Sequence, residues 1–259
     1  MHAEKCTLLL ASLSLPSAHQ LAVIAKERGW RVHALDEYPD VSVTGDRTFY
    51  GGSDRAAEYA TRFDLALFEP LLDLLARVPL DLRLRDIRFC TLRELSRLQG
   101  PLFVKPADPI AKVFDAGVYR RLDDLLARGL DRETPVLVSE PIEWTSEFRC
   151  FVCDGQVVAW SPYLSFGRPV WKPQSAGRLP ASLKSFCGRL IERMGDALPP
   201  AFVVDIGVVD DGGWAVVEFN PAWCSGILGA DVEGALIAIR RSARWAMRST
   251  AADRRWIRL

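Results

Sequence analysis

The first part of the chain alternates short apolar runs with an amphipathic helix. Residues 6–11 form an apolar run, residues 16–28 place apolar side chains on one helical face before Gly29, and residues 30–35 are again mostly apolar. A strand, a helix and a second strand in this order are typical of a parallel sheet. We therefore predict a small α/β unit at the N-terminus. The segment after the first strand lacks the G-x-G-x-x-G pattern, which argues against a dinucleotide site there.

After Pro101 the pattern changes to short strands joined by turns, with strands expected at residues 102–105, 136–139, 147–153 and 156–160. The Asp154-Gly155 pair between the last two strands is a strong hairpin signal. Helices are expected over residues 181–194 and 232–247, on either side of a final hairpin. We expect a boundary near Gly100, which divides the chain into an N-terminal α/β domain over 1–99 and a second domain over 100–259.

That final hairpin joins two apolar runs, residues 202–209 and 214–219, through the turn sequence Asp-Asp-Gly-Gly. The turn predicts that Val209 lies opposite Trp214 and Asp205 opposite Glu218, with the two carboxylate-bearing Cβ atoms about 5 Å apart. Two carboxylates that close repel each other, so ionising both requires a cation between them. Asn220 follows one pleat along on the same face, and such oxygen donors suit Mg²⁺ or Mn²⁺ rather than zinc. The alternative is a hairpin whose polar side chains simply face solvent.

Composition excludes several classes of function. Hydrophobic residues make up 49% of the 259 positions, and 33 Lys and Arg balance 33 Asp and Glu, so nothing favours binding to nucleic acid or an anionic membrane. The three histidines all lie near the N-terminus, which argues against histidine-based zinc or triad chemistry at the hairpin. Cys150 and Cys153 fall on opposite faces of one strand and are expected to be buried free thiols. No apolar stretch reaches the ~20 residues of a membrane span, so we expect a cytoplasmic protein.

Two lysines and an acid–base pair precede the final hairpin. Lys105 and Lys112 stand in a chain that otherwise prefers arginine, and a compact ammonium suits contact with a phosphate oxygen. Strand alternation places Glu147 and Arg149 on one face. An acid and a base two residues apart can also simply pair with each other. The stretch over 77–97 holds six arginines, most of them expected to be solvated or paired with local acids, while one or two that face a cleft could bind an anionic substrate.

Taken in order, these pieces resemble the ATP-grasp superfamily, and most closely its R-two-K clade. The matching motifs run from Phe103 to Pro221: a strand lysine, a second lysine, an acidic hinge, an acid seven residues later and a D…E-x-N hairpin. The resemblance implies an α+β ATP-grasp fold, in which two α+β subdomains clasp ATP, preceded by a small Rossmann-like α/β domain. Two features depart from the family. No glycine-rich phosphate loop lies between the lysines and the hinge, and Val203 stands where many ligases of the superfamily have arginine.

The resemblance also implies a role for each matching residue. Lys105 and Lys112 would contact the ATP phosphates, and Arg149 would act with Lys105 on the transferring phosphate. The other implied roles are the hinge that reads adenine through its backbone (Glu140, Pro141 and Ile142), the acid that holds the ribose (Glu147) and the ligands of Mg²⁺ (Asp205, Glu218 and Asn220).

The implied activity is that of an ADP-forming carboxylate–amine ligase. A substrate carboxylate would attack the γ-phosphate of ATP to give an acyl phosphate, and an amine would then displace phosphate to form an amide. Nothing in the chain obviously supplies a covalent nucleophile, which agrees with attack by a substrate carboxylate. The expected partner is a small molecule, an amino acid or a peptide, and the oligomeric state stays open. Two alternatives remain: a phosphotransferase on the same fold, and a non-catalytic nucleotide-binding module.

Overall fold

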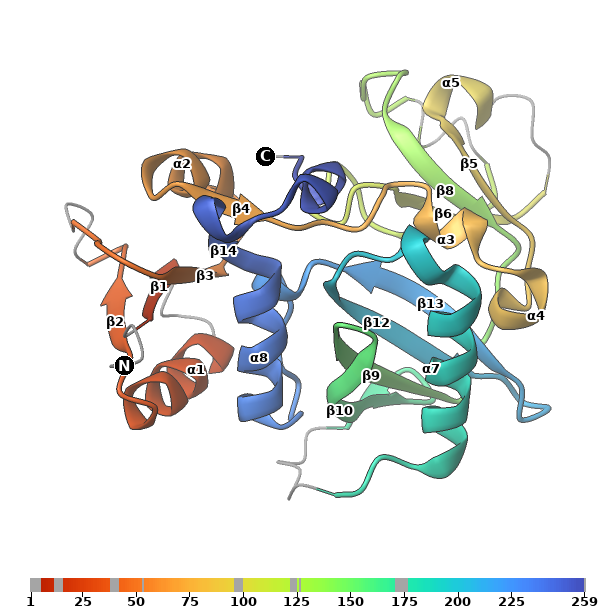
Figure 1. The fold of residues 1–259 in the computed structure, drawn as a ribbon. Helices are drawn as coiled ribbons and strands as arrows, with labels where there is room; N and C mark the ends of the chain where they lie inside the picture. The colour runs from red at the N-terminus through yellow and green to blue at the C-terminus, as the bar shows by residue number, and fades with distance from the viewer. Residues whose placement is uncertain are drawn as a thin grey trace.

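Three sheets form the scaffold of the protein (Figure 1). The computed structural model describes residues 6–11, 16–37, 42–52, 54–95, 100–121, 125, 127–170 and 177–258. Within them, strand order is β2-β1-β3-β14-β4 in the first sheet, β11-β10-β9-β12-β13 in the central sheet and β5-β8-β6-β7 in the third.

The N-terminal strand–helix–strand unit is present as predicted. Strand β1 (Thr7–Ala11) leads into α1 (Pro16–Glu27) and β2 (Arg31–Ala34), and β1 and β2 pair in parallel. Strand β3 (Arg47–Gly51) adds to the other side of β1, again in parallel. Helix α2 (Ala56–Arg62) and strand β4 (Leu65–Leu67) follow. A Rossmann-like assignment for this unit remains a prediction.

The last helix is shorter than the sequence predicts. Helix α8 (Val232–Ser242) ends where residues 243–245 form strand β14 between β3 and β4, so the prediction of a helix over 232–247 is wrong beyond Ser242. The edges of β3 and β4 offer backbone partners that compete with the helix, and the Thr48 hydroxyl donates to the Ala243 carbonyl at 2.5 Å. The C-terminal part of the chain thereby completes the N-terminal sheet.

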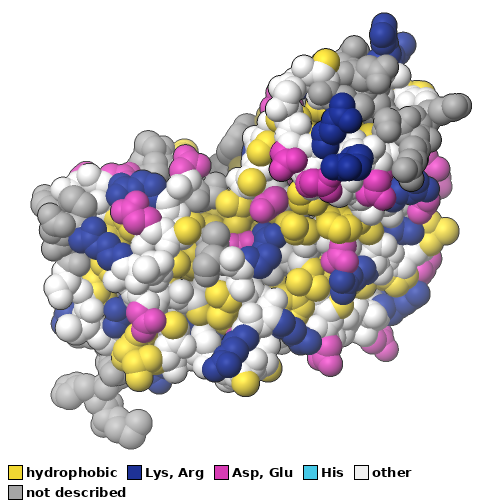
Figure 2. Space-filling model, turned by 90° about the horizontal axis from the view of Figure 1, so that it is seen from above, with side chains coloured by type: hydrophobic (Ala, Val, Ile, Leu, Met, Phe, Trp, Pro, Cys, Tyr) yellow, Lys and Arg dark blue, Asp and Glu magenta, His cyan; other side chains and the backbone are white. Residues whose placement is uncertain are grey.

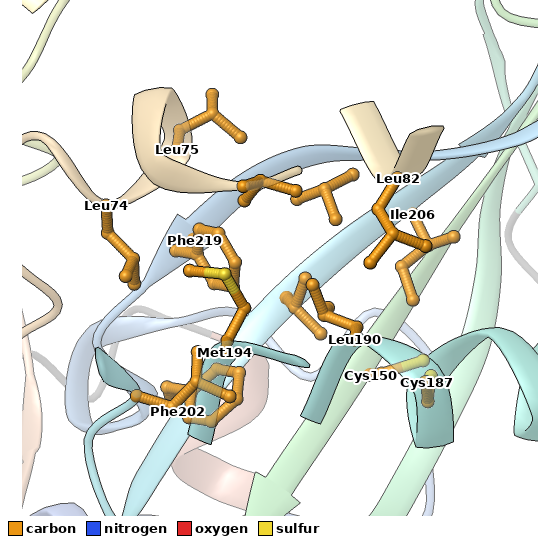
Figure 3. Packing of buried hydrophobic residues seen from close by; sticks show 14 of the residues in the cluster. Leu74, Leu75, Leu82, Cys150, Cys187, Leu190, Met194, Phe202, Ile206 and Phe219 are labelled. Carbon is orange, nitrogen blue, oxygen red and sulfur yellow. The ribbon is translucent and has the colours of Figure 1, made fainter. Parts of the chain in front are cut away.

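The central sheet is antiparallel and is covered on both faces. It contains β9 (Ser146–Cys153), β10 (Gln156–Ser165), β11 (Arg168–Pro169), β12 (Ala201–Val208) and β13 (Trp214–Asn220). Helix α7 (Ala181–Met194) lies on one face, where Leu190 and Met194 pack near Phe202 and Phe219 (Figure 3). Helix α8 packs on the other face. Cys150 faces the α7 side and Cys153 the α8 side, and both are buried free thiols, as predicted.

The third sheet forms a smaller lobe above the central one (Figure 1). It contains β5 (Ile87–Thr91), β6 (Leu102–Pro106), β7 (Gly117–Tyr119) and β8 (Pro135–Ser139), with α5 (Leu92–Leu95) following β5. The division after residue 99 remains a proposal. Two pairings cross it, because β5 pairs with β8 and β14 joins the N-terminal sheet.

Short helical turns complete the fold. Helices α3 (Leu74–Arg77) and α4 (Leu80–Arg83) contribute leucines to the cluster between α7 and the central sheet (Figure 3). Short 3-10 turns follow at Gly195–Ala197, Ala222–Cys224, Ala246–Arg248 and Ala251–Trp256. None of the helices in the described ranges combines the length and the apolar composition needed to cross a membrane. On the face seen in Figure 2, basic and acidic side chains are interspersed, in keeping with the zero net charge.

Candidate active site

Three charged residues form one row across the central sheet. Arg149 on β9 lies opposite Asp205 on β12, and Asp205 lies opposite Glu218 on β13. The predicted pairing of Asp205 with Glu218 is therefore confirmed. Because directly opposed side chains in a sheet point to the same face, the register alone brings two acids and one base together.

The turn end of this hairpin differs from the prediction. Val208, not Val209, lies opposite Trp214, and a β-bulge next to Asp205 and Ile206 absorbs the one-residue shift. The additional residue is Val217, which has no partner on β12. The bulge therefore restores the register before Glu218, so that its carboxylate still faces Asp205.

Arg85 binds the backbone at this bulge. Its guanidinium donates to the Val216 carbonyl at 2.9 Å and to the Val217 carbonyl at 3.2 Å, and it also donates to the Arg83 carbonyl at 3.0 Å. The side chain is buried and stacks 5.2 Å from the ring centroid of Trp144. Burial lowers the pKa of Arg85 to about 10. The sequence shows that this stretch is rich in arginine, but it does not show that Arg85 binds backbone carbonyls. A carbonyl is uncharged, so no acidic residue in the sequence marks it as a partner.

Arg149 holds Asp205 in a bidentate pair. Its Nε lies 2.9 Å from Oδ1 and its Nη2 lies 2.7 Å from Oδ2, while Nη1 donates to the Gly226 carbonyl at 3.1 Å. The Asp205 side chain is fully buried. Burial raises the pKa of Asp205 to about 6, against the opposing charge and hydrogen bonds of Arg149. Arg149 thus does not pair with Glu147, which instead accepts a 2.6 Å hydrogen bond from the Tyr163 hydroxyl.

Lys105 links the third sheet to the central one. Its Nζ lies 2.5 Å from Oε2 of Glu218, and Nδ2 of Asn220 donates to Oε1 of the same carboxylate at 2.9 Å. Burial raises the pKa of Glu218, but the charge and hydrogen bond of Lys105 outweigh it, and the net result is a pKa of about 2. Each carboxylate of the row therefore has its own cation. The charge argument for a metal ion between them does not hold in this arrangement.

A cavity of about 290 Å³ opens beside this pair. Lys105, Lys112, Glu218 and Asn220 all line it, together with Asp108, Asp115 and apolar residues of the loop after β6. The cavity therefore brings both predicted phosphate lysines and two of the three predicted metal ligands to one place. Asp205 does not line it, because it is buried beneath Arg149.

Comparison with known proteins agrees with this geometry. The profile of the ATP-grasp domain, R-two-K clade family 2, matches residues 82–237, well over half of the chain. The chain belongs to the R-two-K clade of the ATP-grasp superfamily. No curated protein matches its sequence.

Solved ATP-grasp structures share the fold. A D-cycloserine synthetase is 16% identical, with 91% of this chain and 98% of that chain covered at a TM-score of 0.59. A RimK domain ATP-grasp protein from Sphaerobacter thermophilus is 18% identical, with 90% and 98% covered at 0.53. A D-alanine–D-alanine ligase from Bacillus anthracis, complexed with ATP, is 15% identical, with 88% of each chain covered at 0.50. Identities this low establish the ATP-grasp fold and no more.

The three predicted hinge residues lie on the connection between the third sheet and the central sheet. Glu140, Pro141 and Ile142 connect β8 of the third sheet to β9 of the central sheet, which is where a hinge is expected. The Glu140 carbonyl accepts from the Ser139 hydroxyl at 3.0 Å, and the exposed Glu140 side chain accepts from the Asp86 amide at 3.4 Å. Their part in adenine binding stays a prediction.

Two further observations concern aromatic residues that neighbour the predicted site residues in sequence or in space. Trp223, which lies three residues after Asn220, is fully buried in the core beside Phe49, and its indole nitrogen donates to the Phe68 carbonyl at 3.2 Å. Tyr163, which the sequence analysis did not single out, contacts both Glu147 and Arg149, whose Cζ lies 5.4 Å from its ring centroid. Only the three-dimensional pairing of β10 with β9 brings Tyr163 here, so a sequence pattern gives no signal for it.

Proposed function

We propose that the protein is an ATP- and Mg²⁺-dependent, ADP-forming carboxylate–amine ligase. The observation that carries the proposal is the shared cavity of Lys105, Lys112, Glu218 and Asn220 in an ATP-grasp fold. Two ammonium groups beside a carboxylate and an amide match what a magnesium-bound triphosphate requires, namely positive charge for phosphate oxygens and oxygen donors for the metal.

The donor set fits Mg²⁺ with one qualification. No cluster of three or more His, Cys, Asp or Glu side chains with metal-binding geometry is found among the residues that the structure describes. The fit rests instead on Glu218 and on the amide oxygen of Asn220, both at the cavity wall. Asp205 would join them only after Arg149 releases one of its oxygens.

The ion pairs therefore have to exchange partners when MgATP binds. When bound, MgATP supplies the phosphoryl group and the divalent charge. Lys105 would then leave Glu218 and donate to a phosphate oxygen, while Glu218 turns from the ammonium to the metal. After this exchange, the fixed charges around the phosphates would stabilise the transferring phosphoryl group during the reaction.

Arg149 is the residue proposed to act on the reacting carboxylate. Its pair with Asp205 and its bond to Gly226 use three of the five N–H donors of a guanidinium. The two others donate to none of the residues that the structure describes, and we assign them to an oxygen of the substrate carboxylate or of the acyl phosphate made from it. Amide formation is proposed because the solved relatives named above include ligases, and the nucleophile is proposed to be an amino acid, a peptide or a small amine in the cytoplasm.

The test is a product assay with pooled amino acids and other carboxylates. Release of ADP and inorganic phosphate in equal amounts, dependent on both a carboxylate and an amine and matched by the amide formed, supports the ligase, whereas ADP without free phosphate indicates a phosphotransferase. ATP binding without ADP release under any condition would leave a nucleotide-binding module. Glu218→Gln serves as the inactive control, with its melting temperature measured to establish that it folds.

A further inference from the structure

A small apolar cavity lies beside the charged row. Its volume is about 70 Å³, and it is lined by Tyr163, Leu164, Pro169, Val170 and Leu228. Pockets that enclose a whole drug-sized ligand measure about 300–1,000 Å³, so this one has room for a side chain and not for an entire substrate. Apart from the Tyr163 hydroxyl, which is held by Glu147, the lining side chains carry no polar group.

The cavity wall is continuous with Arg149. The guanidinium stacks on the ring of Tyr163, and its Nη1 donates to the Gly226 carbonyl. A Cβ atom built on Gly226 would lie 3.6 Å from Cδ2 of Leu228 and 3.9 Å from Nη1 of Arg149. Only the width of one glycine therefore separates the guanidinium from the apolar wall.

Leu228 adopts a backbone conformation that leucine rarely takes. Its φ is +51°, and Gly229 follows at +84°. A non-glycine residue in the left-handed region is strained, and such residues cluster at ligand-binding sites. The Leu228 side chain lines the cavity beside Arg149.

We propose that this cavity binds the aliphatic side chain of the carboxylate substrate, while Arg149 binds its carboxylate. The inference rests on the proposed function and specifies its acyl substrate: a carboxylic acid, such as an amino acid, with a small aliphatic side chain. A charged side chain is disfavoured because the apolar wall offers it no partner.

The test measures binding, so that it does not depend on turnover. Dissociation constants for glycine, alanine, valine, leucine and phenylalanine, each chiral one in both enantiomers, are measured by calorimetry with Mg²⁺ and a non-hydrolysable ATP analogue. The variant is Leu228→Phe, which fills the cavity. The matched control is Leu84→Phe, because Leu84 is also a leucine in the left-handed region, with a φ of +52°, and lies at the end of α4 outside the cavity.

The proposal predicts affinity that rises about fourfold per added methylene up to valine or leucine and falls for phenylalanine. Leu228→Phe should weaken binding of the preferred amino acid by about tenfold or more, with glycine little changed. Leu84→Phe should leave the dissociation constants of glycine and of the preferred amino acid as in the wild type. Both variants should bind the ATP analogue with wild-type affinity.

Three results would overturn the assignment of this cavity to the substrate side chain. They are an affinity that does not depend on side-chain size, equal affinities in Leu228→Phe and Leu84→Phe, and no binding of any of these carboxylates. Size-dependent binding without ADP release would instead leave the pocket standing and overturn the ligase proposal.

Discussion

Replacing Arg149 with methionine should destabilise the protein strongly, because the Asp205 carboxylate would remain buried without its cation. The Asp205 side chain is 0% exposed and that of Arg149 only 12%. Removing one partner of a buried ion pair costs about 3–5 kcal/mol. For a protein of this size, each kcal/mol lowers the melting temperature by about 2–4 °C, so the expected loss is roughly 6–20 °C.

The loss should depend on pH in a defined direction. The pKa of Asp205 is already raised to about 6 by burial, and Arg149 is the group that opposes this rise. Without Arg149 the pKa rises further. A carboxyl whose folded pKa lies above its unfolded value favours the folded state at low pH and loses that contribution as pH rises through the folded pKa. Arg149→Met should therefore be closer to wild-type stability at pH 5 than at pH 8.

Urea unfolding at both pH values measures the effect. Arg77→Met is the control, because Arg77 forms an exposed helical pair with Asp73, four residues away, and should cost less than about 1 kcal/mol. The double variant Arg149→Met/Asp205→Asn should recover much of the loss. A cost for Arg149→Met below about 1 kcal/mol, or an equal cost at both pH values, would refute the reasoning.

Three other predictions follow from the same contacts. Arg85→Met should lower the free energy of unfolding by about 1–3 kcal/mol, since it leaves the Val216 and Val217 carbonyls without their donor; urea unfolding measures this, with the exposed Arg88→Met as control. Glu218 has a pKa lowered to about 2, so its contribution to stability is present above its ordinary pKa and is lost as pH falls toward 2. Glu218→Gln should therefore lose less stability than the wild type between pH 4.5 and pH 2, as followed by circular dichroism. Glu147→Gln should reduce the preference for ATP over 2′-deoxy-ATP in binding, and equal wild-type affinity for the two nucleotides would contradict a ribose contact.

Local patterns in the sequence predict much of the scaffold. Helix α7 spans 181–194 as expected, and the strands around Asp154-Gly155 form the expected hairpin. These elements are specified by their own periodicity and turn residues. The predicted pairing of Asp205 with Glu218 is also correct, but the predicted register at the turn is wrong by one residue. A β-bulge compensates for this shift before Glu218, and no residue type in the sequence predicts the bulge.

Features that depend on distant partners are not predictable in this way. Strand β14 continues a helical pattern in the sequence and becomes a strand only because β3 and β4 present open edges. Arg85 contacts backbone carbonyls more than 130 residues away, and Tyr163 meets Glu147 only across the sheet. The sequence likewise predicts a metal ion between two repelling acids, whereas the structure balances each acid with its own cation from another strand.

Calorimetric titration with ATP in the presence and absence of Mg²⁺ tests the central claim most directly. The wild type should bind ATP at one site with affinity that increases with Mg²⁺. Lys105→Ala and Lys112→Ala, whose side chains line the proposed phosphate cavity, should each weaken ATP binding by about tenfold to a hundredfold, as expected for loss of one charge-assisted contact of roughly 1.5–3 kcal/mol. The exposed Lys184→Ala should bind as the wild type does. Absence of ATP binding to the wild type, or unchanged affinity in both cavity variants, would contradict the account.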